Sequence, residues 1–169
     1  MGRGREAALA PFVRRTLAPA LQRFGAVKRQ GEPETVTVLR PRLLEMLGDA
    51  GRDEAVLSAM ERVAAAYVAD AASVDPSLAD TAIQLSAIRG DAALFDLYRS
   101  RFEAAKVPAE RRRFLSALGN FRDPALADRA LDYVFTGPLR PQEISVIPRT
   151  MGAVPAEQAK TFVWMTAHY

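Results

Sequence analysis

Apolar residues recur along the chain every three to four positions, which is the spacing of one face of an α-helix. The first two segments show the pattern at Val13, Leu17, Ala20 and Phe24, and at Val36, Leu39, Leu43 and Leu47. Gly25 and Gly48 follow these segments as stop signals. No stretch alternates apolar and polar residues for long enough to indicate a β-strand. The pattern therefore predicts a protein built from α-helices.

Glycine and proline residues divide the pattern into nine expected helices, which begin near residues 5, 34, 53, 76, 91, 108, 124, 141 and 155. Asp53, Asp75, Asp91 and Asp123 stand just before apolar runs, where an aspartate caps the free N–H groups of a helix. The eighth segment contains Pro148, so we expect that helix to be short or kinked.

The expected helices are short and are joined by short loops, which favours antiparallel pairs of sequence neighbours. Asp53, Asp91 and Asp123 stand 38 and 32 residues apart, within the range of two-helix repeats. We therefore predict an all-α fold, namely a right-handed α-solenoid of HEAT- or armadillo-like antiparallel helix pairs with about nine helices. A globular bundle is the alternative, and it would favour fewer and longer helices.

The last segment does not look like the end of a helical array. The positions of the ninth helix expected to face the core are Ala159, Phe162, Val163 and Thr166. No glycine stop or polar tail follows Trp164, whereas a solenoid needs polar terminal repeats. We interpret Trp164 as a packing residue between repeats, and we expect residues 1–169 to be a single helical-repeat domain cut from something longer.

Composition narrows the classes of function. The chain has no cysteine, so it has no disulfide, no cysteine-ligated zinc and no thiol nucleophile. Its one histidine, His168, is next to the last residue and has no evident partners for catalysis or for metal binding. These features argue against most self-contained hydrolases, although enzymes that use Lys, Asp, Glu, Tyr or a cofactor stay open.

The chain is only slightly basic, because its 23 Lys and Arg residues outnumber its 20 Asp and Glu residues by three, which gives a net charge of +3. The basic runs are Arg14–Arg15 and Arg111–Arg113, and acidic residues are interspersed elsewhere. A nucleic-acid interface needs an uncompensated basic stripe, usually with stacking aromatic residues. We interpret both runs as solvated helix faces and expect no nucleic-acid partner.

The sequence also has no apolar window of about 18 residues, so we expect no membrane span. Residues 1–6 lack the apolar core of a signal peptide. The compartment stays open, with the cytoplasm slightly favoured, because a secretion signal would lie upstream if the chain is a fragment.

Three segments, taken in their order and spacing, carry a resemblance to a known family. They are DPSLADTAIQLSAIRGDAALFDLY at 75–98, RFLSALGNFRDPAL at 113–126 and RPQE at 140–143, which is followed by FVW at 162–164. Together they resemble the C-terminal helical domain of the aminopeptidase N family of zinc aminopeptidases, most closely that of the puromycin-sensitive and endoplasmic-reticulum aminopeptidases. The resemblance covers residues 12–169, and the family's domain continues past the Trp-containing helix.

The resemblance implies a non-catalytic role. In such enzymes an upstream thermolysin-like domain carries the HExxH zinc site, whereas this chain has no HExxH, no GxMEN motif and no adequate set of zinc ligands. We therefore expect no hydrolysis by this chain alone, no cofactor in it, and zinc in the parent's catalytic domain. The implied partners are that catalytic domain, in the same polypeptide, and a peptide substrate. The alternatives are a stand-alone HEAT-like scaffold for proteins or peptides and a basic solenoid that binds nucleic acid.

Two residues in the RPQE segment are candidates for substrate binding. Arg140 and Gln142 stand at an expected helix start, where they could meet the backbone or the C-terminal carboxylate of a peptide. An arginine suits a carboxylate because its planar fork donates two parallel hydrogen bonds. The alternative is that both residues cap a helix or pair with a neighbour. No catalytic or metal-binding residue is assigned.

Overall fold

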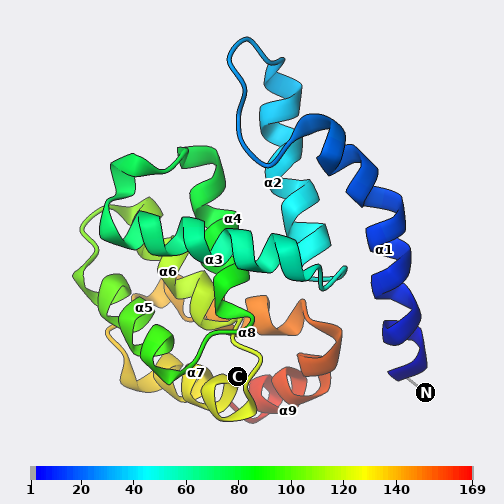
Figure 1. Ribbon diagram of the computed structural model, residues 1–169. Coiled ribbons are helices and arrows are strands. Elements are labelled where there is room, and N and C mark those ends of the chain that lie inside the picture. The colour runs from blue at the N-terminus through cyan, green and yellow to red at the C-terminus, as the bar shows by residue number, and fades with distance from the viewer. Residues whose placement is uncertain (1–2, 169) are drawn as a thin grey trace. The chain divides into compact units, whose positions relative to one another are not determined.

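The computed structural model describes residues 3–168, and these form nine α-helices and three short 3-10 helices without a β-strand (Figure 1). The all-α prediction is therefore confirmed. The chain divides into two compact units, Met1–Ser86 and Ala87–Tyr169.

The first unit contains four α-helices that follow one another along the chain. They are α1 (Arg3–Phe24), α2 (Glu34–Gly48), α3 (Glu54–Ala69) and α4 (Pro76–Ala87), with the 3-10 helix η1 (Ala71–Ser73) between the last two. The first two form an antiparallel hairpin, and α3 packs on α2 (Figure 1). Such packing between sequence neighbours is typical of helical repeats.

The second unit contains five α-helices, of which α8, with 7 residues, is the shortest. They are α5 (Ala92–Ala104), α6 (Pro108–Leu118), α7 (Pro124–Thr136), α8 (Val146–Gly152) and α9 (Gln158–His168). The 3-10 helices η2 (Pro141–Glu143) and η3 (Pro155–Glu157) precede α8 and α9. The most extensive contact in this unit joins α5 to α6, while α8 contacts α6, α7 and α9.

The predicted aspartate caps are confirmed. Asp53, Asp91 and Asp123 accept hydrogen bonds from backbone N–H groups in the first turns of α3, α5 and α7, at 2.9 to 3.2 Å. Asp75 accepts from the N–H of Ser77 at 2.9 Å in the same way at the start of α4. Each carboxylate satisfies a donor that the helix itself cannot pair.

The core of the first unit is mainly aliphatic. Leu43, Leu44 and Leu47 of α2 are buried, as are the inward residues of α3. A Cβ atom on Gly48 would lie 2.8 Å from a methyl group of Leu85 on α4, so a larger residue there would require the Leu85 side chain to shift. Arg14 of α1 donates to the carbonyl of Gly51, which attaches α1 to the turn between α2 and α3.

The core of the second unit contains a cluster of aromatic rings. Phe95 and Tyr98 of α5 pack against Phe121, with ring centroids 5.1 and 6.2 Å apart, and Tyr98 also lies 5.3 Å from Phe114 of α6. These rings are all buried, and they meet at tilted and edge-to-face angles that favour aromatic pairs. The cluster joins α5, α6 and the turn that follows α6.

The eighth segment differs from the single helix expected near residue 141. It divides into η2 and α8, and Pro148 occupies the third position of α8. Proline is tolerated there because the first N–H groups of a helix have no partner within it. The helix is therefore short, as predicted, without a proline in its interior.

The inward face predicted for α9 is wrong. Phe162 and Val163 are 67% and 66% exposed, and Ala159 and Thr166 are exposed as well. The buried residue of α9 is Thr161, and Trp164 is half-buried one turn further on. Hydrophobicity identified an apolar stripe, but packing on α8 decided which stripe turns inward.

Within the described residues 3–168, no helix is both long enough and apolar enough to cross a bilayer.

Thr161 provides a test of packing in the second unit. Its hydroxyl is buried without a hydrogen-bond partner, which costs about 1–3 kcal/mol of desolvation. We expect Thr161→Val to raise the free energy of unfolding by about 1 kcal/mol, measured by urea denaturation. Thr150→Val is the matched control, since it removes a hydroxyl that donates to the carbonyl of Val146 at 2.9 Å and should give no gain. A loss of stability in Thr161→Val would contradict the assignment of an orphan hydroxyl.

Candidate functional site

The two predicted site residues lie in the turn between α7 and α8. Arg140 precedes η2 and Gln142 lies within it, and both side chains are exposed. In the described part of the chain neither side chain forms a hydrogen bond. Their predicted contact with a peptide therefore stays a prediction.

The backbone of this turn is held by Glu143 rather than by the predicted residues. The N–H of Arg140 donates to Oε2 of Glu143 at 2.8 Å, and the N–H of Glu143 donates to the carbonyl of Arg140, also at 2.8 Å. The two bonds close the turn on itself in the manner of a capping box. Arg140 is therefore the N-cap residue of η2, as the capping alternative expects, and the cap uses its backbone and the Glu143 side chain rather than its guanidinium.

Glu143 is itself fixed by Arg111 of α6. The Nε and Nη2 atoms of Arg111 donate to the two carboxylate oxygens of Glu143 at 2.7 and 3.0 Å. Nη2 also donates to the carbonyl of Pro138 at 2.8 Å, and Nη1 to the carbonyl of Phe102 at 3.2 Å. The guanidinium carbon lies 4.0 Å from the centre of the Phe102 ring. We call Arg111, Glu143 and these carbonyl groups the Arg111 clamp.

The electrostatics of the clamp follow from this geometry. Hydrogen bonding to Glu143 raises the pKa of Arg111 above its ordinary value. Burial acts to raise the pKa of Glu143, but the hydrogen bonds from Arg111 and from the Arg140 N–H outweigh it and lower that pKa. Both groups are therefore charged near neutral pH. The interpretation of residues 111–113 as a solvated face is wrong at Arg111, whose side chain is only 9% exposed.

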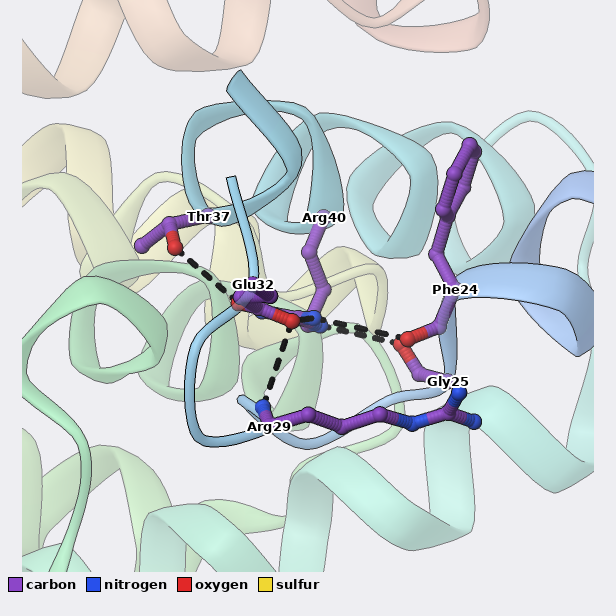
Figure 2. Close-up of polar contacts among 6 residues, drawn as sticks. All are labelled: Phe24, Gly25, Arg29, Glu32, Thr37 and Arg40. Atoms are coloured by element: carbon purple, nitrogen blue, oxygen red, sulfur yellow. Dashed lines mark hydrogen bonds and ion pairs between the residues drawn. The ribbon is translucent and has the colours of Figure 1, made fainter. Parts of the chain in front are cut away.

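A second buried arginine organises the first unit. Figure 2 shows the side chain of Arg40 extending from α2 to Glu32 in the loop that joins α1 to α2, and this side chain is 1% exposed. Its Nη1 and Nη2 atoms donate to the two carboxylate oxygens of Glu32 at 2.8 and 2.5 Å. Its Nε donates to the carbonyl of Gly25 at 2.9 Å, and Nη2 reaches the carbonyl of Phe24 at 3.4 Å. We call this group the Arg40 clamp.

The Arg40 clamp completes the end of α1 and holds the loop. Gly25 has φ +77°, in the left-handed region that terminates helices, and its carbonyl has no acceptor role within the helix. Glu32 also accepts from the N–H of Arg29 at 3.2 Å and from the hydroxyl of Thr37 at 3.0 Å (Figure 2). The hydrogen bond from Arg40 is the largest cause that lowers the pKa of Glu32 from 4.5 to about 2.

The apolar pattern did not predict either clamp, although the sequence contains a signal for both. Arg40 lies between Val36 and Leu43 at helical spacing, on the face predicted to be buried. Leu39, which was assigned to that face, is 41% exposed. Arg111 likewise lies one turn before Phe114 and Leu115. A charged residue inside a predicted apolar stripe indicates a buried, paired charge.

The C-terminal aromatic residues pack on one another. Trp164 of α9 lies 5.3 Å from the ring of Phe135 on α7 and 4.8 Å from the ring of His168. The Nδ1 atom of His168 lies 2.7 Å from the carbonyl of Trp164, so it carries the proton of that hydrogen bond. Trp164 thus packs between α9 and α7, while its predicted place between repeats stays a prediction. Within residues 3–168, no three His, Asp or Glu side chains converge as metal ligands would.

Comparison with known proteins produced one family. The family model described as the ERAP1-like C-terminal domain matches residues 3–169. A search of curated proteins found no match.

The Arg40 clamp predicts an asymmetry between two arginines of α2. We expect Arg40→Met to lower the stability of the first unit, because it removes the guanidinium donors to the carbonyl of Gly25 and to the Glu32 carboxylate, which loses its cationic partner. Amide exchange in residues 25–33 should accelerate with it. Arg42→Met is the control, since Arg42 is 75% exposed and makes only a surface ion pair with Glu45. Equal stability of the two variants in urea denaturation would argue against the clamp.

The depressed pKa of Glu32 predicts a pH dependence. A carboxylate with a pKa of about 2 when folded, against 4.5 ordinarily, stabilises the fold fully above pH 4.5 and loses that effect as the pH falls towards 2. We expect the stability difference between wild type and Glu32→Gln to be largest near pH 7 and to shrink over that interval. Glu34→Gln serves as the control for loss of one carboxylate nearby. A difference that stays constant from pH 7 to pH 2 would contradict the assignment.

Proposed function

The chain belongs to the ERAP1-like C-terminal domain family, and from that membership we propose that it is the non-catalytic helical cover of a zinc-dependent aminopeptidase. Domains of this family are part of larger aminopeptidase polypeptides. In this proposal residues 1–169 form one helical-repeat piece of a longer C-terminal domain. The catalytic domain, with its zinc, lies outside the sequence, and this chain covers it.

The proposed task of the cover is to shape the cavity that holds the peptide. Helical repeats suit that task because stacked short helices present an extended surface whose loops can vary without loss of the core. Movement of the cover between open and closed positions would admit peptides and then exclude water from the cleavage site. The match of the family model over residues 3–169 is the observation that carries this proposal.

We assign contact with the peptide to the turn that contains Arg140 and Gln142. Both side chains are exposed, and their guanidinium and amide groups suit a peptide carboxylate and a peptide backbone respectively. The turn is held by Glu143, so these groups extend from a fixed backbone. This arrangement supports recognition at small entropic cost, since only the two side chains become ordered on binding.

The size and the peptidase activity of the natural gene product test the proposed function. An antibody raised against this chain should detect a band much larger than 18.5 kDa in cells that express the gene. The immunoprecipitate should hydrolyse an aminoacyl fluorogenic substrate, and a zinc chelator should abolish that hydrolysis. The isolated chain, assayed with added zinc as the control, should release no product.

Other results would contradict the proposal. A band of 18.5 kDa without peptidase activity, together with a discrete co-purified protein, would favour the stand-alone scaffold instead. Binding of DNA or RNA that weakens steeply with salt would favour the nucleic-acid alternative.

A further inference from the structure

The Arg111 clamp reaches both sides of the turn that carries Arg140. Nη2 of Arg111 donates to the carbonyl of Pro138, two residues before Arg140, at 2.8 Å. The same atom donates to Oε2 of Glu143, three residues after Arg140, at 3.0 Å. One buried nitrogen atom therefore fixes the separation between the two ends of the turn.

The clamp also determines where the backbone of Arg140 lies. Oε2 of Glu143, which Arg111 holds, accepts the N–H of Arg140 at 2.8 Å. Pro141 restricts the next φ angle, so little backbone freedom is left within the turn. On its inner side the clamp is anchored to α5 through the carbonyl and the ring of Phe102. The guanidinium of Arg140 is thus exposed, while its backbone is fixed by the buried guanidinium of Arg111.

We propose that Arg111 is the positioning residue of the peptide-contacting turn, and that it sets how well Arg140 discriminates a peptide with a free C-terminal carboxylate from its amide. The inference rests on the proposed function, because it takes Arg140 as a group that contacts the peptide. Two parallel hydrogen bonds to a carboxylate require the guanidinium to arrive in one orientation, and a mobile turn would lose that geometry.

The chemistry of the clamp requires arginine at residue 111. Its planar fork donates to both oxygens of Glu143 and to two carbonyl groups at once, through Nε, Nη1 and Nη2. A lysine keeps the positive charge but offers a single nitrogen, which cannot span Glu143, Pro138 and Phe102 together. Arg111→Lys therefore separates charge from geometry, and it avoids leaving the Glu143 carboxylate buried without any cation.

Two readouts on the 169-residue chain test the inference. The first is amide hydrogen exchange at Arg140 and Glu143, which reports the turn without any ligand. The second is the ratio of dissociation constants for a nonapeptide amide and for the same nonapeptide with a free C-terminus. We compare wild type with Arg111→Lys and Arg140→Ala, and we take Arg112→Met as the control, since Arg112 is the exposed neighbour on α6.

We expect Arg111→Lys to accelerate exchange at Arg140 at least tenfold and to reduce the acid-over-amide preference to that of Arg140→Ala. Arg112→Met should change neither. Unfolding measured in parallel shows whether each variant remains folded. The peptide ratio distinguishes positioning from a structural role, because a merely structural role would weaken binding of both peptides equally. Two results in Arg111→Lys would overturn the inference and leave the proposed peptide contact intact. They are faster exchange with an undiminished acid-over-amide preference, and unchanged exchange. Absence of any preference in wild type, or its persistence in Arg140→Ala, would overturn the proposed peptide contact and the inference with it.

Discussion

A guanidinium group keeps its charge at any pH a protein meets, so an arginine carried into a helix interface must find acceptors there. Among the side chains that the structure describes, residues 8–168, each compact unit contains one such buried group. Arg40 and Arg111 each donate two hydrogen bonds to a carboxylate and use their remaining donors on backbone carbonyls at helix ends and in loops. Breaking either pair would leave a charge without its partner, which costs more than the intact pair gains. The constraint therefore attaches the loop between α1 and α2 to α2, and the turn before α8 to α6.

The two clamps give an array of short helices well-defined connections. Short helices hold few intrahelical bonds and depend on tertiary packing for their stability. In the first unit the Arg40 clamp completes the end of α1 and holds the loop before α2. In the second, the Arg111 clamp connects the end of α5, the start of α6 and the turn before α8. If the chain covers a peptidase, as proposed, loops held in this way would keep a constant surface towards the peptide.

Local signals account for most of what could be predicted. Aspartate caps and apolar spacing locate the helices because both act within one or two turns of the chain. Asp53, Asp91 and Asp123 accept the bonds expected of them. The same spacing failed at α9, where Phe162 and Val163 face outward and Thr161 is buried. A helix of 11 residues with apolar side chains on several faces does not determine by itself which face its neighbours cover.

The sequence by itself determined the helical class, the capping residues and the membership suggested by its three segments, because each depends on residues close together in the chain. Only the tertiary structure decided the partners of Arg40 and Arg111. Glu32 precedes its arginine by 8 residues, and Glu143 follows its own by 32. Neither spacing belongs to any helix or turn, so no local pattern predicts the pairing. Folding brings the carboxylates to the guanidinium groups, since a buried charge without a partner costs too much free energy to keep.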